Sequence, residues 1–229
     1  MILLFDIDGT LLQSHGVGRR SIEAALADTL GDTFDTFDTS DISFSGKTDG
    51  LIFREIVAAA QDRGLHAGPD AVARLEAAYA ERMHAALPDA HVEALPGALE
   101  LVHQLAADGV DLGLLTGNLQ PLAFAKIERL GLGPAEFAFG AFGSDAHDRE
   151  DLPAIAIRRA EAHLGRTVAP AEVAVIGDTP RDIACARAGG CIAVAVATGR
   201  YDAGALRDAD LTLDTLADFR LADVEAVVA

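Results

Sequence analysis

The chain has 229 residues, half of them hydrophobic, and a formal net charge of −18 from 36 acidic and 18 basic side chains. This length is enough for one large domain or two unequal ones. The negative charge repels polyanions, so we expect neither nucleic acid nor an anionic membrane as a partner. A small anionic substrate stays compatible with it, because the charge of a pocket is set locally.

The termini and cysteines add little to this outline. The N-terminal apolar run reaches Asp6 without a basic leader, and no run of about 18 apolar residues occurs, so we expect neither a signal peptide nor a membrane span. The cysteines Cys185 and Cys191 have no spacing that suggests a disulfide or, with histidine, a zinc site. We therefore expect a reduced cytoplasmic protein that works as a monomer or homodimer.

The first predicted element is a buried strand over the apolar run from Ile2 to Phe5. Two carboxylates, Asp6 and Asp8, follow it, and Gly9 then permits a sharp turn. Carboxylates at the end of a buried strand are costly to desolvate unless a metal or a reacting group uses them. Taken alone, the segment fits a catalytic pair and a simple turn equally well.

Helical spacing dominates the next part of the chain. Three segments are predicted as helices, with no strong strand signal between them: 19–30, 51–63 and 70–87. An acidic stretch, 32–41, is predicted to be a surface loop. We therefore expect residues 14–95 to form a helical domain inserted after the first strand.

Strands and helices alternate from about residue 96. The predicted strands are 110–115, 172–176 and 191–196, with a further apolar run at 137–142, and the predicted helices are 119–130, 152–164 and 182–188. This alternation is typical of a parallel sheet with helices on both faces. We predict an α/β fold with a Rossmann-like, doubly wound parallel core made of residues 1–13 and 96–229.

Three later segments carry polar groups where predicted strands end, and these ends share one edge of a parallel sheet. Thr116, Gly117 and Asn118 place a hydroxyl and amides before a helix, which suits phosphate oxygens or simple helix capping. Arg149 could neutralise a carboxylate and a phosphate, or lie in solvent.

The last segment contains Asp178 and Asp182. Asp182 has near capping-box spacing from Thr179, so helix capping alone could explain it. Asp178 has no such explanation and is the better metal ligand. Oxygen ligands without a nearby histidine or cysteine favour magnesium.

Taken together, these four segments resemble the motif order of the haloacid dehalogenase superfamily, in a branch with a small helical cap similar to phosphoglycolate phosphatases. The resemblance covers the whole chain. One departure is that arginine, Arg149, stands where many relatives have Lys followed by Pro.

The resemblance implies a mechanism for dephosphorylating a small phosphorylated metabolite. Asp6 would attack phosphorus, while Asp8 would protonate the leaving oxygen and then activate water. Magnesium would be held by Asp6, the backbone carbonyl of Asp8 and Asp178, with Asp182 supporting its water shell. Thr116, Gly117, Asn118 and Arg149 would hold the phosphate.

The resemblance also implies that the helical insertion acts as a cap, and Lys47 is our candidate there for contact with the substrate. The first alternative function is a sugar-phosphate mutase similar to beta-phosphoglucomutase, which would return the phosphoryl group to substrate. A non-catalytic binding protein is the second, but it would be expected to have lost Asp6 or Asp178.

Overall fold

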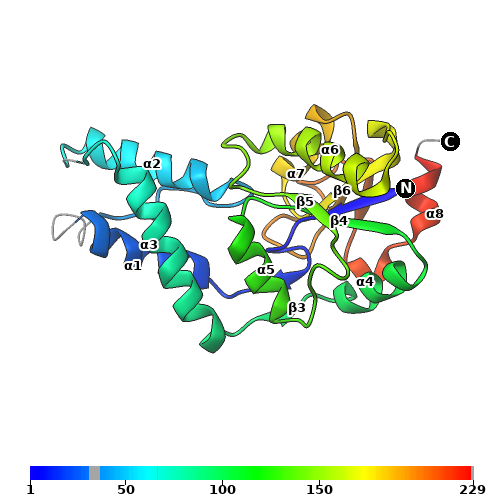
Figure 1. Ribbon diagram of the computed structural model, residues 1–229, viewed down its shortest axis with the longest axis horizontal. Coiled ribbons are helices and arrows are strands. Elements are labelled where there is room, and N and C mark those ends of the chain that lie inside the picture. Colours follow the sequence, from blue (N-terminus) through cyan, green and yellow to red (C-terminus); the bar gives the residue numbers. More distant parts are fainter. Residues whose placement is uncertain (31–36, 66, 228–229) are drawn as a thin grey trace.

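The computed structural model describes residues 1–30, 37–65 and 67–227. At its centre lies a parallel sheet with the strand order β5-β4-β1-β6-β7-β8 (Figure 1). The strands are β1 (Ile2–Phe5), β4 (Asp111–Leu115), β5 (Phe139–Ala141), β6 (Val173–Gly177), β7 (Ile192–Val196) and β8 (Leu211–Leu213). This arrangement confirms the predicted α/β class with a doubly wound parallel sheet.

Side chains alternate between the two faces of the sheet along each strand. Helices cover both faces, so both sets of side chains are buried. In β1, Leu3 and Phe5 pack toward one set of helices, and Ile2 and Leu4 pack toward the other. The first set is α4 (Ala98–Ala107), α5 (Gln120–Glu128) and α8 (Leu221–Ala226). The second set is α6 (Leu152–Leu164) and α7 (Pro180–Ala188).

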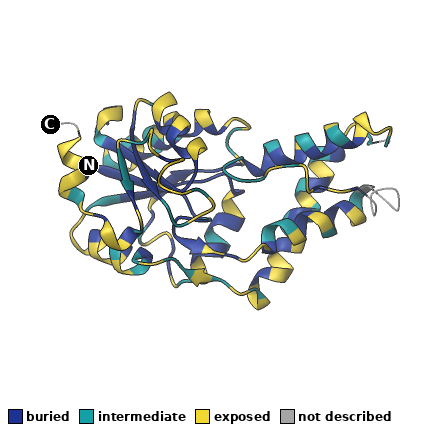
Figure 2. Cartoon of the chain, turned by 180° about the vertical axis from the view of Figure 1, so that it is seen from behind, coloured by how far each residue is buried: buried dark blue, intermediate teal, exposed yellow. Residues whose placement is uncertain are grey.

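A helical insert extends from one side of the sheet (Figure 1). It consists of α1 (Val17–Leu30), α2 (Asp49–Asp62) and α3 (Ala71–Ala86). The helices bury their apolar faces against one another and expose their outer faces (Figure 2). Leu119 and Leu122 at the start of α5 belong to the same apolar cluster, so the insert also packs on the core.

A short antiparallel ribbon joins the insert to the core. Its strands are β2 (Leu12–Gln13) and β3 (Glu93–Ala94), with Leu12 paired to Ala94 and Gln13 paired to Glu93. The two chain segments that enter and leave the insert are thereby hydrogen-bonded side by side. A ribbon this short has no visible sequence periodicity, which is why the sequence did not predict it.

Sequence and structure agree closely on most other elements. The helix at 152–164 matches α6 in both bounds, while α4, α8 and β8 were not predicted. Residues 32–36 of the predicted acidic loop lie outside the described residues. Within the described part of the chain, no helix is both long and apolar enough to cross a membrane.

Candidate active site

Polar side chains meet where β1, β4 and β6 end, because parallel strands deliver their carboxyl ends to one edge. Asp6 directly follows β1, Thr116 follows β4 and Asp178 follows β6. In the sheet, β4 lies on one side of β1 and β6 on the other, so the order of the strands reverses at β1. The carboxyl end of β1 is therefore the topological switch point of the sheet. A pocket of about 560 Å³ opens here toward the insert.

Three buried carboxylates lie close together here: Asp6 after β1 and Asp178 after β6 line the pocket, and Asp182 belongs to α7 (Pro180–Ala188). Oxygens of Asp6, Asp178 and Asp182 all lie within 4.8 Å of one another. Burial raises the pKa of Asp6 to about 6, although the Arg149 charge opposes the rise. Burial and the charges of Asp182 and Asp6 raise the pKa of Asp178 to about 8. Three carboxylates buried this close together are costly in free energy unless a cation neutralises their charge.

Arg149 supplies part of that positive charge. Its Nη2 lies 3.1 Å from Oδ2 of Asp6 and 2.5 Å from Oδ1 of Asp182. The guanidinium is buried, and its attraction to the two carboxylates keeps the pKa of Arg149 above its ordinary value in spite of that burial. The structure therefore pairs Arg149 with Asp6 and Asp182, while no ion pair to Asp178 occurs among the described residues.

The surroundings of Asp178 fit a divalent metal ion. Its Oδ1 is buried and has no hydrogen-bond partner among the described residues. A Cβ at Gly9 would lie 2.4 Å from Oδ2 of Asp178, and a Cβ at Gly199 would lie 1.7 Å from it. Two glycines thus leave room for the Asp178 carboxylate, which lies within 4.8 Å of carboxylate oxygens of Asp6 and Asp182, and oxygen donors of this kind suit magnesium.

Asp182 also caps α7. Its Oδ2 accepts hydrogen bonds from the backbone N–H of Thr179 at 2.9 Å and from the Thr179 hydroxyl at 2.7 Å. The Thr179 hydroxyl in turn accepts from the N–H of Asp182, completing the capping box. Asp182 therefore uses one oxygen for the helix and the other for Arg149.

Asp8 lies apart from the three carboxylates and has its own partners. Its Oδ2 accepts from Nζ of Lys126 at 2.6 Å and from the Asn118 amide at 2.9 Å, and its Oδ1 accepts from Ser14 at 3.1 Å. Burial raises the pKa of Asp8, but the charge and hydrogen bond of Lys126, together with the hydrogen bonds of Asn118 and Ser14, outweigh the effect of burial and leave the pKa lowered.

Sequence reasoning missed Lys126. It lies on α5, on the same buried face as Leu122 and Ile127. A signal was present, because the chain has only two lysines and this one falls on the apolar face of a predicted helix. A buried lysine needs a partner of opposite charge, and Asp8 was a candidate for that partner.

The loop after β4 connects this edge of the sheet with the insert. Thr116 is fully buried, and its hydroxyl accepts from the Asn118 side chain at 2.7 Å. A Cβ at Gly117 would lie 2.1 Å from the carbonyl oxygen of Lys47, so only glycine permits this approach. The N–H of Asp49 donates to the Gly117 carbonyl at 2.8 Å, which fastens the start of α2 to the same loop.

Lys47 lines the same pocket as Asp6 and Thr116. Its ammonium pairs with Glu55 on α2, and its side chain is only 10% exposed. Lys47 is thus part of the pocket wall, and its charge is paired with a residue of the insert. All of the predicted site residues come together around one pocket, with Asp182 behind Arg149 as its buried partner.

This fold, with acidic side chains where its strands end, defines an α/β protein with a candidate active site lined by carboxylates. The family model for haloacid dehalogenase-like hydrolases matches residues 3–187. The chain belongs to that family, as its sequence predicted.

Similar proteins narrow the kind of hydrolase. The chain is 30% identical over 220 residues to a validoxylamine A 7'-phosphate phosphatase of Streptomyces hygroscopicus subsp. limoneus, covering 96% of this chain and 95% of that one. It is 33% identical over 140 residues to a phosphoglycolate phosphatase of Chromobacterium violaceum, covering 61% of this chain but only 60% of that protein. These relatives are phosphatases, which confirms the predicted enzyme class of phosphoric monoester hydrolase.

A solved structure agrees with this fold. CbbY from Rhodobacter sphaeroides, in complex with phosphate, superposes with a TM-score of 0.75 at 22% identity, covering 98% of each chain. At that identity the likeness establishes the fold alone.

Proposed function

We propose that this chain hydrolyses a small phosphomonoester in a magnesium-dependent reaction with an aspartyl-phosphate intermediate on Asp6. One observation carries the proposal: the carboxylate of Asp6 lies within 4.8 Å of Asp178 and Asp182 and 3.1 Å from the Arg149 guanidinium, on the floor of an open pocket. A nucleophile and groups that neutralise phosphate are therefore side by side.

In the first step, a carboxylate oxygen of Asp6 attacks phosphorus, and the bond from phosphorus to the ester oxygen breaks. The leaving oxygen takes a proton from Asp8 as it departs. Thr116 and Arg149 line the pocket where the phosphoryl oxygens would lie, and Arg149 screens Asp6 from their charge. Lys126 keeps the pKa of Asp8 low, so the negative charge of the bound ester has to raise it for this step.

In the second step, Asp8 takes a proton from water while the water oxygen attacks phosphorus. The bond between phosphorus and Asp6 breaks, releasing inorganic phosphate and restoring the carboxylate. Ionised Asp8 is the form needed here, and Lys126, Asn118 and Ser14 hold it in that form. These three contacts also fix its orientation.

Magnesium would be held by Asp6, the backbone carbonyl of Asp8 and Asp178, and would supply charge neutralisation at the phosphoryl group. Asp182 would stabilise this arrangement through Arg149 and α7. The unpartnered oxygen of Asp178 and the space left by Gly9 and Gly199 support this assignment.

Residues 14–95 would act as a cap that covers the pocket and selects the substrate. Lys47 and Asp49 lie at the contact between this part and the core, which supports the assignment. The name of the Chromobacterium relative makes phosphoglycolate the first ester to test, and the name of the Streptomyces relative makes a bulkier cyclitol phosphate the second.

A panel of phosphate esters, assayed for phosphate release with and without magnesium, tests this proposal. Hydrolysis that needs magnesium and disappears in Asp6→Asn is expected, while Asp111→Asn at the far end of β4 serves as a matched control. Undiminished phosphate release from Asp6→Asn contradicts the nucleophile assignment. Isomerisation of a sugar phosphate without phosphate release identifies the mutase instead.

A further inference from the structure

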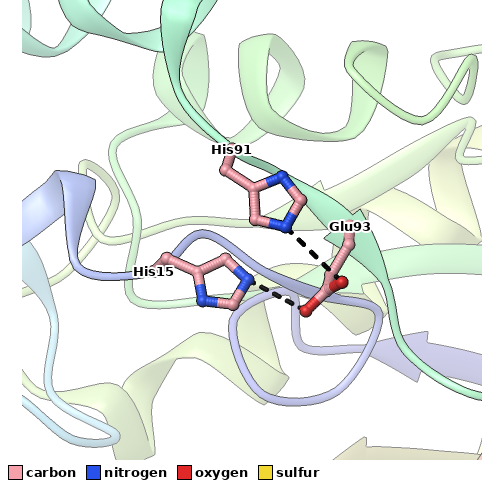
Figure 3. A group of neighbouring side chains, drawn as sticks. All are labelled: His15, His91 and Glu93. Atoms are coloured by element: carbon pink, nitrogen blue, oxygen red, sulfur yellow. Dashed lines mark hydrogen bonds and ion pairs between the residues drawn. The ribbon is translucent and has the colours of Figure 1, made fainter.

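The ribbon that joins the insert to the core carries two histidines and a glutamate at its open end (Figure 3). Gln13 pairs with Glu93 at the end of the ribbon, and just beyond this pair the His15 and His91 rings stack on each other. Residues 91 and 93 face the same side of the ribbon because side chains alternate along a strand. The end of the ribbon therefore brings His15, His91 and Glu93 close together.

The ligand atoms of these side chains converge. Nε2 of His15 lies 2.9 Å from Oε1 of Glu93, and Nε2 of His91 lies 3.6 Å from Oε2 of the same carboxylate. The two imidazoles stack with their centroids 4.7 Å apart. Donors bonded to one tetrahedral zinc ion at about 2.1 Å lie about 3.4 Å from each other. The two histidines contact different oxygens of Glu93, and one ligand atom from each of the three residues lies within 4.8 Å of the other two.

The backbone of His15 forms a turn that helps to place its ring. With φ at +47°, it is the only non-glycine residue with positive φ in the described ranges. Its carbonyl accepts from Arg20 at 2.8 Å, which holds the turn in place. Backbone strain of this kind costs free energy and is concentrated at functional sites. Here the strained turn directs the His15 ring toward Glu93.

We propose that His15, His91 and Glu93 form a second metal site, which binds one divalent transition metal ion of the zinc class. Imidazole nitrogens suit zinc, whereas magnesium prefers oxygen donors. Three protein ligands leave a fourth position for water, and the side chains are exposed by 42%, 71% and 52%, so the ion can enter from solvent. This site is separate from the buried carboxylates and does not depend on the proposed phosphatase reaction.

The ion would clamp the ribbon. His15 lies on the segment entering the insert, and His91 and Glu93 lie on the segment leaving it, so a shared ion ties the two together. Ser14, next to His15, donates to Asp8 at 3.1 Å, and Glu93 lines the large pocket. The clamp therefore stiffens the hinge on which the insert would move relative to the sheet edge.

The direct test is calorimetric titration of the full chain with zinc, in millimolar magnesium, after removal of transition metals. Binding of one zinc ion per chain is expected, and cobalt in its place should give the visible absorption of a tetrahedral site. His15→Gln and His91→Gln should each weaken zinc binding by about tenfold or more. His103→Gln, on the exposed face of α4, is the matched control and should bind zinc as the unmodified chain does.

Two results overturn the site: no zinc binding at all, or equal binding by the unmodified chain and both histidine variants. Loss of zinc binding in Asp178→Asn but not in His91→Gln overturns it as well, because the ion then occupies the buried carboxylates. Hydrogen exchange tests the clamp. Zinc should slow exchange of the amides at 12–14 and 92–94, except in His91→Gln, and unchanged exchange in zinc-bound protein refutes the clamp.

Discussion

Nζ of Lys126 lies 2.6 Å from Oδ2 of Asp8, although the two residues are 118 positions apart in the chain. The lysine is almost fully buried, with 4% of its side chain exposed, and it also donates to Asn118 at 2.6 Å. The proposed acid–base residue is thus held by a cation from the neighbouring strand–helix unit.

We expect Lys126→Met to lower kcat by roughly 100-fold, the low end of what a positioned acid–base group contributes. Since Lys126 lowers the pKa of Asp8, its loss raises that pKa, and the acidic limb of the kcat–pH profile should move to higher pH. Arg129→Met, on the exposed face of the same turn, should leave the profile unchanged. An unaltered profile in Lys126→Met refutes the positioning role.

Magnesium binding should depend on the room that Gly199 leaves for the Asp178 carboxylate. In Gly199→Ala the new Cβ would lie 1.7 Å from Oδ2 of Asp178, so the carboxylate has to move. We expect magnesium affinity, measured by calorimetry, to fall at least about tenfold while the fold remains. Gly133→Ala is the matched control because a Cβ there meets nothing within 4 Å. Equal affinities in the two variants argue against Asp178 as a ligand.

The metal-free protein should be less stable at pH 8 than at pH 6. Asp178 has a pKa of about 8 in the folded chain against an ordinary value of 3.8, so the folded state binds more protons between these values. The free energy of unfolding therefore falls as pH rises through this range. Asp6, with a pKa of about 6, acts in the same direction at its lower end.

Magnesium replaces the proton on Asp178, so it should stabilise the protein more at pH 8 than at pH 6. Thermal unfolding at both pH values, with and without magnesium, measures this difference. Asp178→Asn should remove most of it. A magnesium effect that is equal at both pH values speaks against metal binding by this carboxylate.

Lys47→Ala should raise KM for the true substrate by roughly tenfold and change kcat little, if the ammonium contacts a distant anionic group of the substrate. In the structure this ammonium pairs with Glu55, which must release it. Glu55→Gln therefore frees Lys47 and should leave KM equal or lower. An unchanged KM in Lys47→Ala excludes the contact.

Hydrophobic periodicity predicted the fold class, and strand-end polarity singled out residues that the structure brings around one pocket. Asp6, Thr116 and Asp178 each follow an apolar run, and parallel strands bring such ends together by necessity. Lys126 was not predicted, because its role depends on which residue the buried face of α5 meets. That meeting is a tertiary contact, and local sequence spacing does not encode it.

The sequence by itself therefore determined the α/β class, the family and the residues at the strand ends, since these follow from local pattern and chain order. Only the tertiary structure decided the partners: Lys126 on Asp8, Arg149 between Asp6 and Asp182, and Glu55 on Lys47. It also decided that His15 and His91, far apart in the chain, lie opposite each other. Ion pairs and metal sites depend on distances of a few ångströms, which are set when separate elements pack together.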